Sequence, residues 1–100
     1  MGVGVGSGIC GLITVRDLLG LKTEIIGVCA VSEDAIAEAM RIYFDDAHQV
    51  AEGAGATPLA ALLQERGSMA NENVAVVLGG GNIERKRYLQ VLSGVTPPAV

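Results

Sequence analysis

The sequence predicts an α/β fold, a minimal three-stranded parallel sheet flanked by helices, of the Rossmann-like kind. Short β-prone runs occur at 3–5, 24–28 and 74–78. Between and after them lie segments whose apolar residues recur at helical spacing, which gives the order β-α-β-α-α-β-α. Right-handed crossovers between successive strands place such strands parallel in one sheet. Three strands leave both sheet edges open, so we expect a homodimer to cover them.

The first predicted strand runs into a glycine turn at Gly6-Ser7-Gly8, and a helix follows over about 9–19. Gly20 suits the position just beyond the end of this helix, where a left-handed backbone is common. A short connection then leads into the second strand, 24–28, which reads as a buried strand.

The second predicted helix begins after Ser32 and runs to about His48. Ser32 is a good N-cap residue, and Glu33 and Asp34 place negative charge in the first turn, where the helix dipole favours it. One apolar stripe results from the spacing of Ile36, Met40, Tyr43 and Phe44.

The start of the third helix is open between two positions. Thr57 can cap it with Pro58 at the first helical position. Alternatively the helix begins near Gly53 and bends at Pro58. Its buried side consists of Leu59, Leu62 and Leu63, and Gly67 ends it.

The last predicted helix follows the third strand and its glycine turn. We expect Asn82 to cap this helix, which runs from Ile83 to about Leu92. Residues 1–93 then form a single domain, and 94–100 form a flexible, extended tail.

Composition narrows the class of function. The net charge of −4 argues against general nucleic-acid binding, which depends on Lys and Arg neutralising phosphates. The basic cluster Arg85, Lys86 and Arg87 reads as a solvated helix face. No apolar run approaches the roughly 20 residues of a membrane span. Two cysteines, Cys10 and Cys29, make no disulfide framework, so we expect a reduced, cytoplasmic setting.

Two glycine-rich turns are candidate phosphate sites. Each follows a predicted strand and opens a helix, an arrangement that directs free backbone N–H groups at an anion. The first consists of Gly4, Gly6, Ser7 and Gly8, and the second of Gly79, Gly80, Gly81 and Asn82. The alternative is that both turns need glycine only for backbone geometry.

The candidate catalytic residues are Ser7, Cys10 and His48. Ser7 could act as a nucleophile with His48 as base, although the residues around Ser7 do not match the G-x-S-x-G elbow. Asp45 or Glu52 could orient His48 if the second helix continues far enough to place them on one face. Cys10 is either a reactive thiol or a small core residue. A lone histidine without suitably spaced cysteines predicts no metal site.

Five collinear segments resemble the threonine/serine dehydratases, pyridoxal-phosphate enzymes of fold type II. They are G-V-G-V-G-S-G-I-C-G-L, L-K-T-E-I-I-G-V, V-S-E-D-A-I-A-E-A-M-R, A-E-G-A-G-A and V-A-V-V-L-G-G-G-N-I. The resemblance is to the large, cofactor-binding domain. It implies that 6–8 wraps the cofactor phosphate, that 79–82 lies under the pyridine ring, and that 52–56 starts a helix on the same face.

The chain also departs from that family. The Schiff-base lysine belongs to a Ser-x-Lys region with no counterpart here, since the lysines of this chain are Lys22 and Lys86. The asparagine loop that grips the substrate carboxylate is missing. Gly79 stands where the family offers a hydroxyl to the pyridine nitrogen. Cys29-Ala30 runs almost directly into Val31-Ser32, where the family has a long intervening segment.

The sequence therefore predicts a truncated and internally deleted remnant of such a large domain, lacking the Schiff-base lysine. We expect a non-catalytic module without dehydratase activity and without a covalently held cofactor. It would bind pyridoxal phosphate or another small phosphate-bearing ligand weakly. The alternatives are a small hydrolase or esterase using Ser7 or Cys10 with His48, and a structural fragment that completes a separately encoded lysine-bearing domain.

Overall fold

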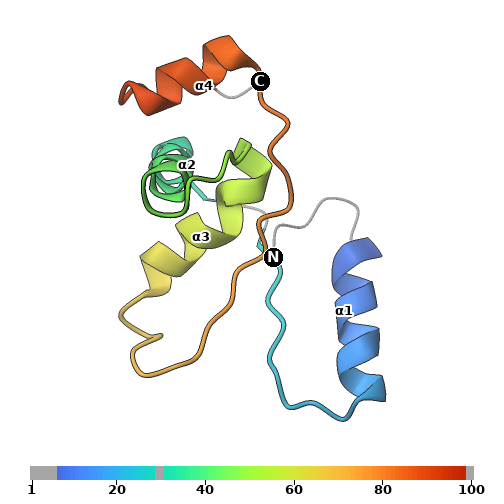
Figure 1. Ribbon diagram of the computed structural model, residues 1–100. Coiled ribbons are helices and arrows are strands. Elements are labelled where there is room, and N and C mark those ends of the chain that lie inside the picture. The colour runs from blue at the N-terminus through green and yellow to red at the C-terminus, as the bar shows by residue number, and fades with distance from the viewer. Residues whose placement is uncertain (1–6, 29–30, 99–100) are drawn as a thin grey trace.

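The computed structural model describes residues 7–28 and 31–98 of the chain. In this part the helices are α1 (Ser7–Leu18), α2 (Glu33–Ala47), α3 (Gly53–Glu65) and α4 (Arg85–Leu92). Helix α2 packs against α3 and α4, and we call these three helices the helix cluster. Helix α1 contacts none of the three and stands apart from them (Figure 1).

The predicted three-stranded parallel sheet is wrong, because the described residues form no strand. The segments 24–28 and 74–78 run as single extended stretches, and Val28 makes only an isolated β-bridge. The first predicted strand, 3–5, lies outside the described residues. The valine- and isoleucine-rich segments have strand propensity, but a strand exists only through hydrogen bonds to a neighbouring strand. Neither described segment acquires such a ladder, so the Rossmann-like description fails with it.

Helix α1 ends as the sequence predicts. The φ angle of Gly20 is +64°, in the left-handed region. The Gly20 N–H donates to the Asp17 carbonyl at 3.2 Å, and the Leu21 N–H donates to the Arg16 carbonyl at 3.0 Å. This pair of bonds is a Schellman motif, which satisfies carbonyls that a helix end leaves without partners.

Helix α2 has the predicted bounds. The Ala35 N–H donates to the Ser32 Oγ at 3.2 Å, so Ser32 is the N-cap. At the other end His48 has a left-handed backbone (φ 53°) and its N–H donates to the Phe44 carbonyl at 3.0 Å.

Helix α3 follows the second of the two predicted alternatives, since it begins at Gly53 and contains Pro58. Pro58 has no N–H to donate within the helix. The Thr57 hydroxyl donates to the Gly53 carbonyl at 3.0 Å, which provides a partner for one carbonyl of the turn before the proline.

Helix α4 begins at Arg85, with Glu84 and not Asn82 at the N-cap position. The predicted Asn82 cap is wrong because the chain makes one more turn first. The Ile83 N–H donates to the Gly81 carbonyl at 3.0 Å, and Asn82 lies exposed within this turn. Flexibility of the tail stays a prediction; in the structure Pro97 is buried, and Arg87 donates to the Pro98 carbonyl at 2.6 Å.

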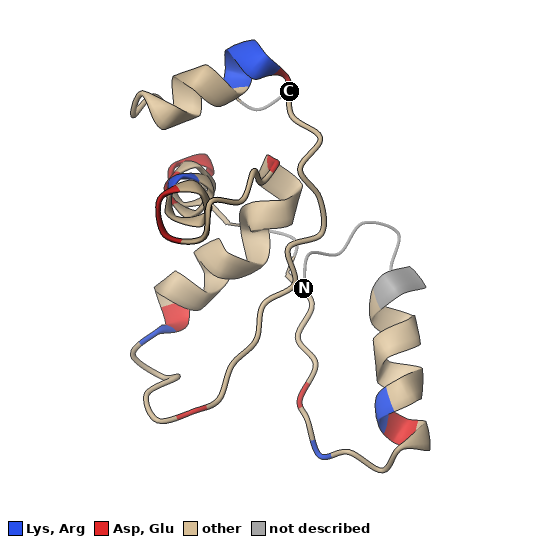
Figure 2. Ribbon diagram, viewed as in Figure 1, with Lys and Arg blue, Asp and Glu red and all other residues tan. Residues whose placement is uncertain are grey.

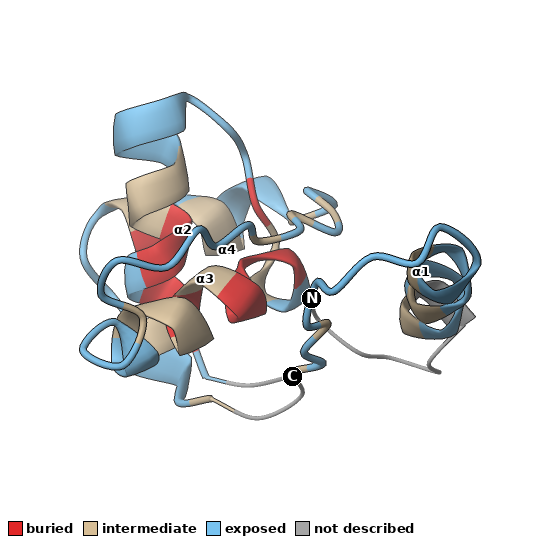
Figure 3. Ribbon diagram, turned by 90° about the horizontal axis from the view of Figure 1, so that it is seen from below, coloured by how far each residue is buried: buried red, intermediate tan, exposed pale blue. Residues whose placement is uncertain are grey.

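The core of the helix cluster is small and made of small side chains. Its buried hydrophobic residues are Ala37, Ala39, Met40, Ala51, Ala56, Ala60 and Val91. Figure 3 shows these buried positions gathered in the cluster, whereas residues 9–18 of α1 include none. The accessible surface of 6847 Å² exceeds the roughly 5,300 Å² expected of a compact monomer of this size. Among the described helices, none is both long enough and apolar enough to cross a membrane.

Candidate functional site

The first predicted phosphate site lies at the start of α1. Ser7 opens this helix and Gly8 follows in its first turn, while Gly4 and Gly6 lie outside the described residues. The first turn of α1 contains no acidic residue, and Arg16 in the last turn suits the dipole. The leading N–H groups of a helix have no intrahelical acceptor and carry partial positive charge. The start of α1 therefore has the local properties of an anion site.

The second predicted site, 79–82, is closely packed against the start of α3. The Glu52 N–H donates to the Gly80 carbonyl at 3.0 Å. A Cβ atom on Gly80 would overlap the Glu52 Oε1, and one on Gly81 would overlap the Val50 carbonyl oxygen. A Cβ atom on Gly55 would likewise meet the Gly80 backbone, with its nitrogen at 2.9 Å. Gly55 and Gly81 therefore lie where two backbones approach each other, whereas the neighbour of Gly80 is the end of the Glu52 side chain.

Glu52 makes this second turn unfavourable for an anion. It occupies the N-cap position of α3, and its carboxylate lies against Gly80. A carboxylate at a helix N-terminus takes the place where a phosphate would interact with the dipole. The sequence shows an acidic residue directly before the glycine-rich helix start, but it does not show that this residue meets the 79–82 turn. The two predicted phosphate sites therefore differ in charge, because the first turn of α1 has no acidic residue whereas the Glu52 carboxylate lies against the 79–82 turn. Helices α1 and α3 do not contact each other.

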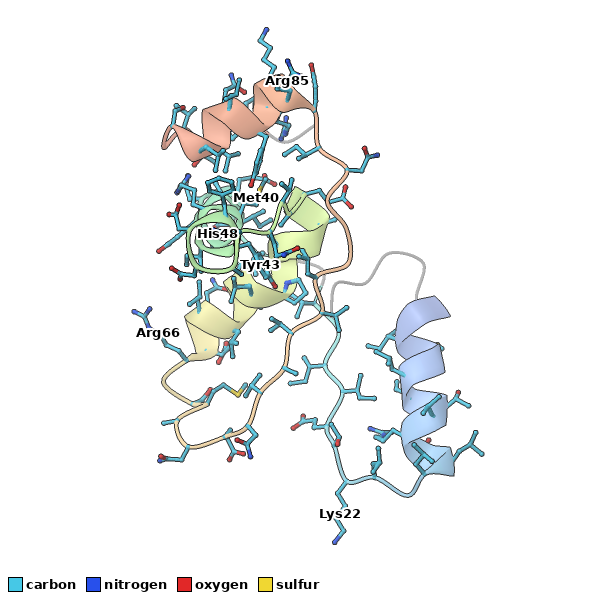
Figure 4. All side chains as sticks on the ribbon, viewed as in Figure 1. Lys22, Met40, Tyr43, His48, Arg66 and Arg85 are labelled. Carbon is cyan, nitrogen blue, oxygen red and sulfur yellow. The ribbon has the colours of Figure 1, made fainter. Side chains whose placement is uncertain are left out.

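The three catalytic candidates do not form a constellation among the described residues. His48 lies at the end of α2, where its Nδ1 is 2.9 Å from the Phe44 carbonyl oxygen. Ser7 lies on α1, which does not contact α2 (Figures 1 and 4). Helix α2 ends at Ala47, so it does not continue far enough to place Asp45, His48 and Glu52 on one helix face.

Cys10 is exposed on α1, so its interpretation as a buried core residue is wrong. Its carbonyl accepts a hydrogen bond of 2.9 Å from the Thr14 hydroxyl. Cys29 lies outside the described residues. Within the described ranges, no group of three or more His, Cys, Asp or Glu side chains could hold a metal ion.

Neither lysine lies near the start of α1. Lys22 is exposed on the extended segment beyond the opposite end of this helix (Figures 2 and 4). The intervening 12 residues of helix span about 18 Å. Lys86 is exposed in the first turn of α4, within the helix cluster. Its neighbour Arg85 is also exposed, while Arg87 is half-buried and bonded to Pro98.

Two tyrosine hydroxyls, those of Tyr43 and Tyr88, are buried in the helix cluster without a hydrogen-bond partner among the described residues. Burial raises the pKa of Tyr43 above its ordinary value of 10.0. Burial also raises the pKa of Tyr88, and the nearby Asp45 carboxylate adds to this effect. The tyrosine ring of Tyr88 meets Phe44 edge-on, with ring centroids 6.4 Å apart.

Comparison with known proteins tests the predicted resemblance to the threonine/serine dehydratases. The chain is 38% identical over 68 residues to a putative threonine dehydratase of Sinorhizobium fredii, a match that covers 68% of this chain and 20% of the relative. It is 39% identical over 64 residues to an L-threonine ammonia-lyase of Thermotoga maritima, covering 64% and 16%. An L-threo-3-hydroxyaspartate ammonia-lyase of a Pseudomonas species is 26% identical over 74 residues, covering 74% and 23%.

No family model and no solved structure matches the chain. The chain spans about a fifth of the length of the curated relatives that it matches. The 38% and 39% identities confirm the predicted resemblance to the threonine dehydratases over about two thirds of this chain.

Proposed function

We propose that the chain is a non-catalytic fragment of a pyridoxal-phosphate-dependent threonine/serine dehydratase domain that retains a weak site for a phosphate group. The observation that carries the proposal is the start of α1 at Ser7. Ser7 and Gly8 stand in the first turn of α1 and belong to the segment 6–8, which the resemblance matches to the loop around the cofactor phosphate. A helix N-terminus free of acidic residues favours an anion at this position.

The positions of the lysines support the non-catalytic part of the proposal. A covalently held pyridoxal phosphate requires a lysine within reach of its aldehyde carbon. Lys22 lies beyond the far end of α1, and Lys86 lies on a helix that does not contact α1. These positions support limiting the proposal to non-covalent binding of the phosphate group.

Calorimetric titration of the full chain with inorganic phosphate, and separately with pyridoxal phosphate, tests the proposal. We expect weak, saturable binding of both ligands. Ser7→Glu adds a carboxylate at the start of α1 and should reduce the affinity at least tenfold, because it competes with the anion for the helix dipole. Asn82→Glu adds the same charge at the exposed position of the other glycine turn and should change the affinity less than twofold.

Absence of binding, or equal loss of affinity in the two variants, would contradict the proposed site. Covalent attachment is checked by borohydride reduction in the presence of pyridoxal phosphate, followed by mass spectrometry. Stoichiometric labelling of one lysine, combined with turnover of threonine or serine, would overturn the non-catalytic assignment.

A further inference from the structure

Helix α4 has little stability of its own. It is eight residues long, and isolated helices shorter than about 12 residues are marginal in water. Its N-cap residue, Glu84, makes no side-chain hydrogen bond to the helix start. Its first turn carries Arg85, Lys86 and Arg87, and Figure 2 shows these basic residues at the start of the helix. Cations at a helix N-terminus oppose the helix dipole, so α4 depends on contacts with the rest of the chain.

The contacts between α4 and α2 are few. Val91 is the buried residue of α4, and its carbonyl accepts a hydrogen bond of 3.1 Å from Arg41 of α2. Tyr88 meets Phe44 edge-on, but the buried Tyr88 hydroxyl has no partner among the described residues. A buried hydroxyl without a partner loses its hydrogen bonds to water, which opposes docking of the helix. The Arg41 bond holds the last turn of α4, and the start of the helix is held by a different segment.

That segment, residues 95–98, follows α4 directly, and we call it the strap. The chain reverses at Gly94, whose φ angle of +93° is one that L side chains rarely adopt. The Gly94 N–H donates to the Val91 carbonyl at 3.1 Å, and the Val95 N–H donates to the Gln90 carbonyl at 2.9 Å. This is a Schellman motif, which ends the helix and turns the chain back along it.

The strap contacts the start of α4 and the first half of α2. Arg87, in the first turn of α4, donates from its Nη2 to the Pro98 carbonyl at 2.6 Å. Pro97 is buried, whereas the neighbouring Pro98 is exposed. Pro97 and Arg87 line a small cavity together with the α2 residues Glu33, Ile36, Ala37 and Met40. The strap therefore joins the two helices at the end of α4 that the Arg41 bond does not reach.

We propose that the strap is a conformational device that keeps α4 docked on α2. When the bond between Arg87 and Pro98 breaks and Pro97 leaves the cavity, α4 separates from α2 as a unit. Helices α2 and α3 stay packed, because α3 contacts α2 and does not contact α4 (Figure 1). Such local opening requires less free energy than global unfolding. It uncovers the apolar residues Ile36, Ala37 and Met40 of α2, so the strap controls access to this surface.

Hydrogen exchange of the full chain, followed by mass spectrometry, tests the strap. Pro97→Ala removes part of the ring that lines the cavity, and it should speed exchange of the α4 amides at least about tenfold. Pro98→Ala is the matched control. It makes the same change one residue later, but the Pro98 side chain is exposed and its carbonyl remains as the acceptor for Arg87. We expect it to change the exchange of α4 less than about twofold.

A second pair of variants tests the hydrogen bond. Arg87→Gln removes the guanidinium that donates to Pro98, and it should also speed exchange of α4 at least about tenfold. Arg85→Gln removes the same charge from the same turn of α4, but Arg85 is exposed, so we expect less than about a twofold change. The double variant Arg87→Gln, Pro97→Ala should exchange little faster than either single variant, because either change already releases the strap.

The α3 amides separate release of α4 from a general loss of stability. They should exchange at the parent rate in every variant, since α3 does not contact α4. Equal effects of the two proline variants, or of the two arginine variants, would overturn the proposal. Unprotected α4 amides in the parent would also overturn it, because α4 would then not be docked. Equal acceleration in α3 and α4 would mean that 95–98 stabilises the whole helix cluster and does not hold α4 in particular.

Discussion

Helices α1 and α3 are alike in sequence and opposite in environment. Both are of similar length, rich in glycine and aliphatic residues, and nearly free of charge in their first two turns. Helix α3 packs against α2 and buries five residues, including Gly55, Ala56 and Ala60, whereas α1 buries none among its described side chains. Apolar composition thus indicates that a helix packs against another surface, but it does not indicate which segment or molecule provides that surface.

The largest expected effect on the free energy of unfolding comes from substitution of a glycine in α3. Gly55→Val places a Cβ atom against the Gly80 backbone, which cannot move as a flexible side chain would. We expect a loss of about 3 kcal/mol or more in the free energy of unfolding, measured by urea denaturation. Gly53→Ala, in the same helix, meets only the Ile36 Cγ2 at 3.6 Å and should be nearly neutral.

The corresponding change in α1 has the opposite sign. A Cβ atom on Gly11 meets nothing within 4 Å, so Gly11→Ala should raise the helicity of α1 and stabilise it by about 0.5–1 kcal/mol. Equal destabilisation by Gly11→Ala and Gly55→Val would contradict the difference in packing between α1 and α3.

Truncating one large apolar side chain in each region sharpens the comparison. Met40 is 3% exposed in the helix cluster, and Met40→Ala should lower the free energy of unfolding by about 2–3 kcal/mol. Leu18→Ala in α1 should lower it by less than about 0.5 kcal/mol at concentrations where the chain is monomeric. A larger cost for Leu18→Ala in the monomer would mean that α1 is packed against the chain itself.

A smaller effect is expected at the start of α2. Ser32→Ala removes the acceptor for the Ala35 N–H and should cost about 1 kcal/mol. Ser68→Ala is the control, since the Ser68 hydroxyl bonds to Glu65 in an exposed turn and caps no helix start. Thermal unfolding followed at a helix-sensitive wavelength compares the two, and an equal shift in both would contradict a capping role for Ser32.

The smallest effect concerns alkaline pH and is confined to the helix cluster. Burial raises the pKa of Tyr43 and Tyr88 in the folded chain, so the unfolded chain releases these protons first. The stabilisation is complete below the unfolded pKa and is lost as pH rises through the folded pKa. Urea denaturation above pH 10 should therefore show a fall in the free energy of unfolding. Tyr43→Phe should reduce this fall, and an unchanged pH dependence would contradict burial of that hydroxyl.

The sequence predicts the helices well because their determinants are local. Ser32 supplies its own acceptor to the first turn of α2, and Gly20 adopts the left-handed backbone that ends α1. The local sequence does not determine whether α3 starts near Thr57 or at Gly53, since both starts are compatible with Pro58. Packing of 53–56 against α2 and the 79–81 turn accompanies the earlier start.

The absence of a sheet from the described residues could not be predicted from the same information. The segments 24–28 and 74–78 have the composition of strands, but pairing depends on neighbours that local sequence does not specify. The candidate phosphate site stays a prediction: α1 starts close to the expected position, and the contact of Glu52 with the 79–82 turn joins two segments that are far apart in the sequence.

The small side chains of the core have a consequence for the response to temperature. Among the described residues the largest fully buried side chain is Val91, so unfolding of the monomer exposes little new apolar surface. The heat capacity change of unfolding scales with that surface and is about 1.2–1.5 kcal/mol/K for an ordinary domain of this length. A smaller value flattens the stability curve, so warming or cooling this chain by a given interval alters its folded population less sharply than in a domain with a full core.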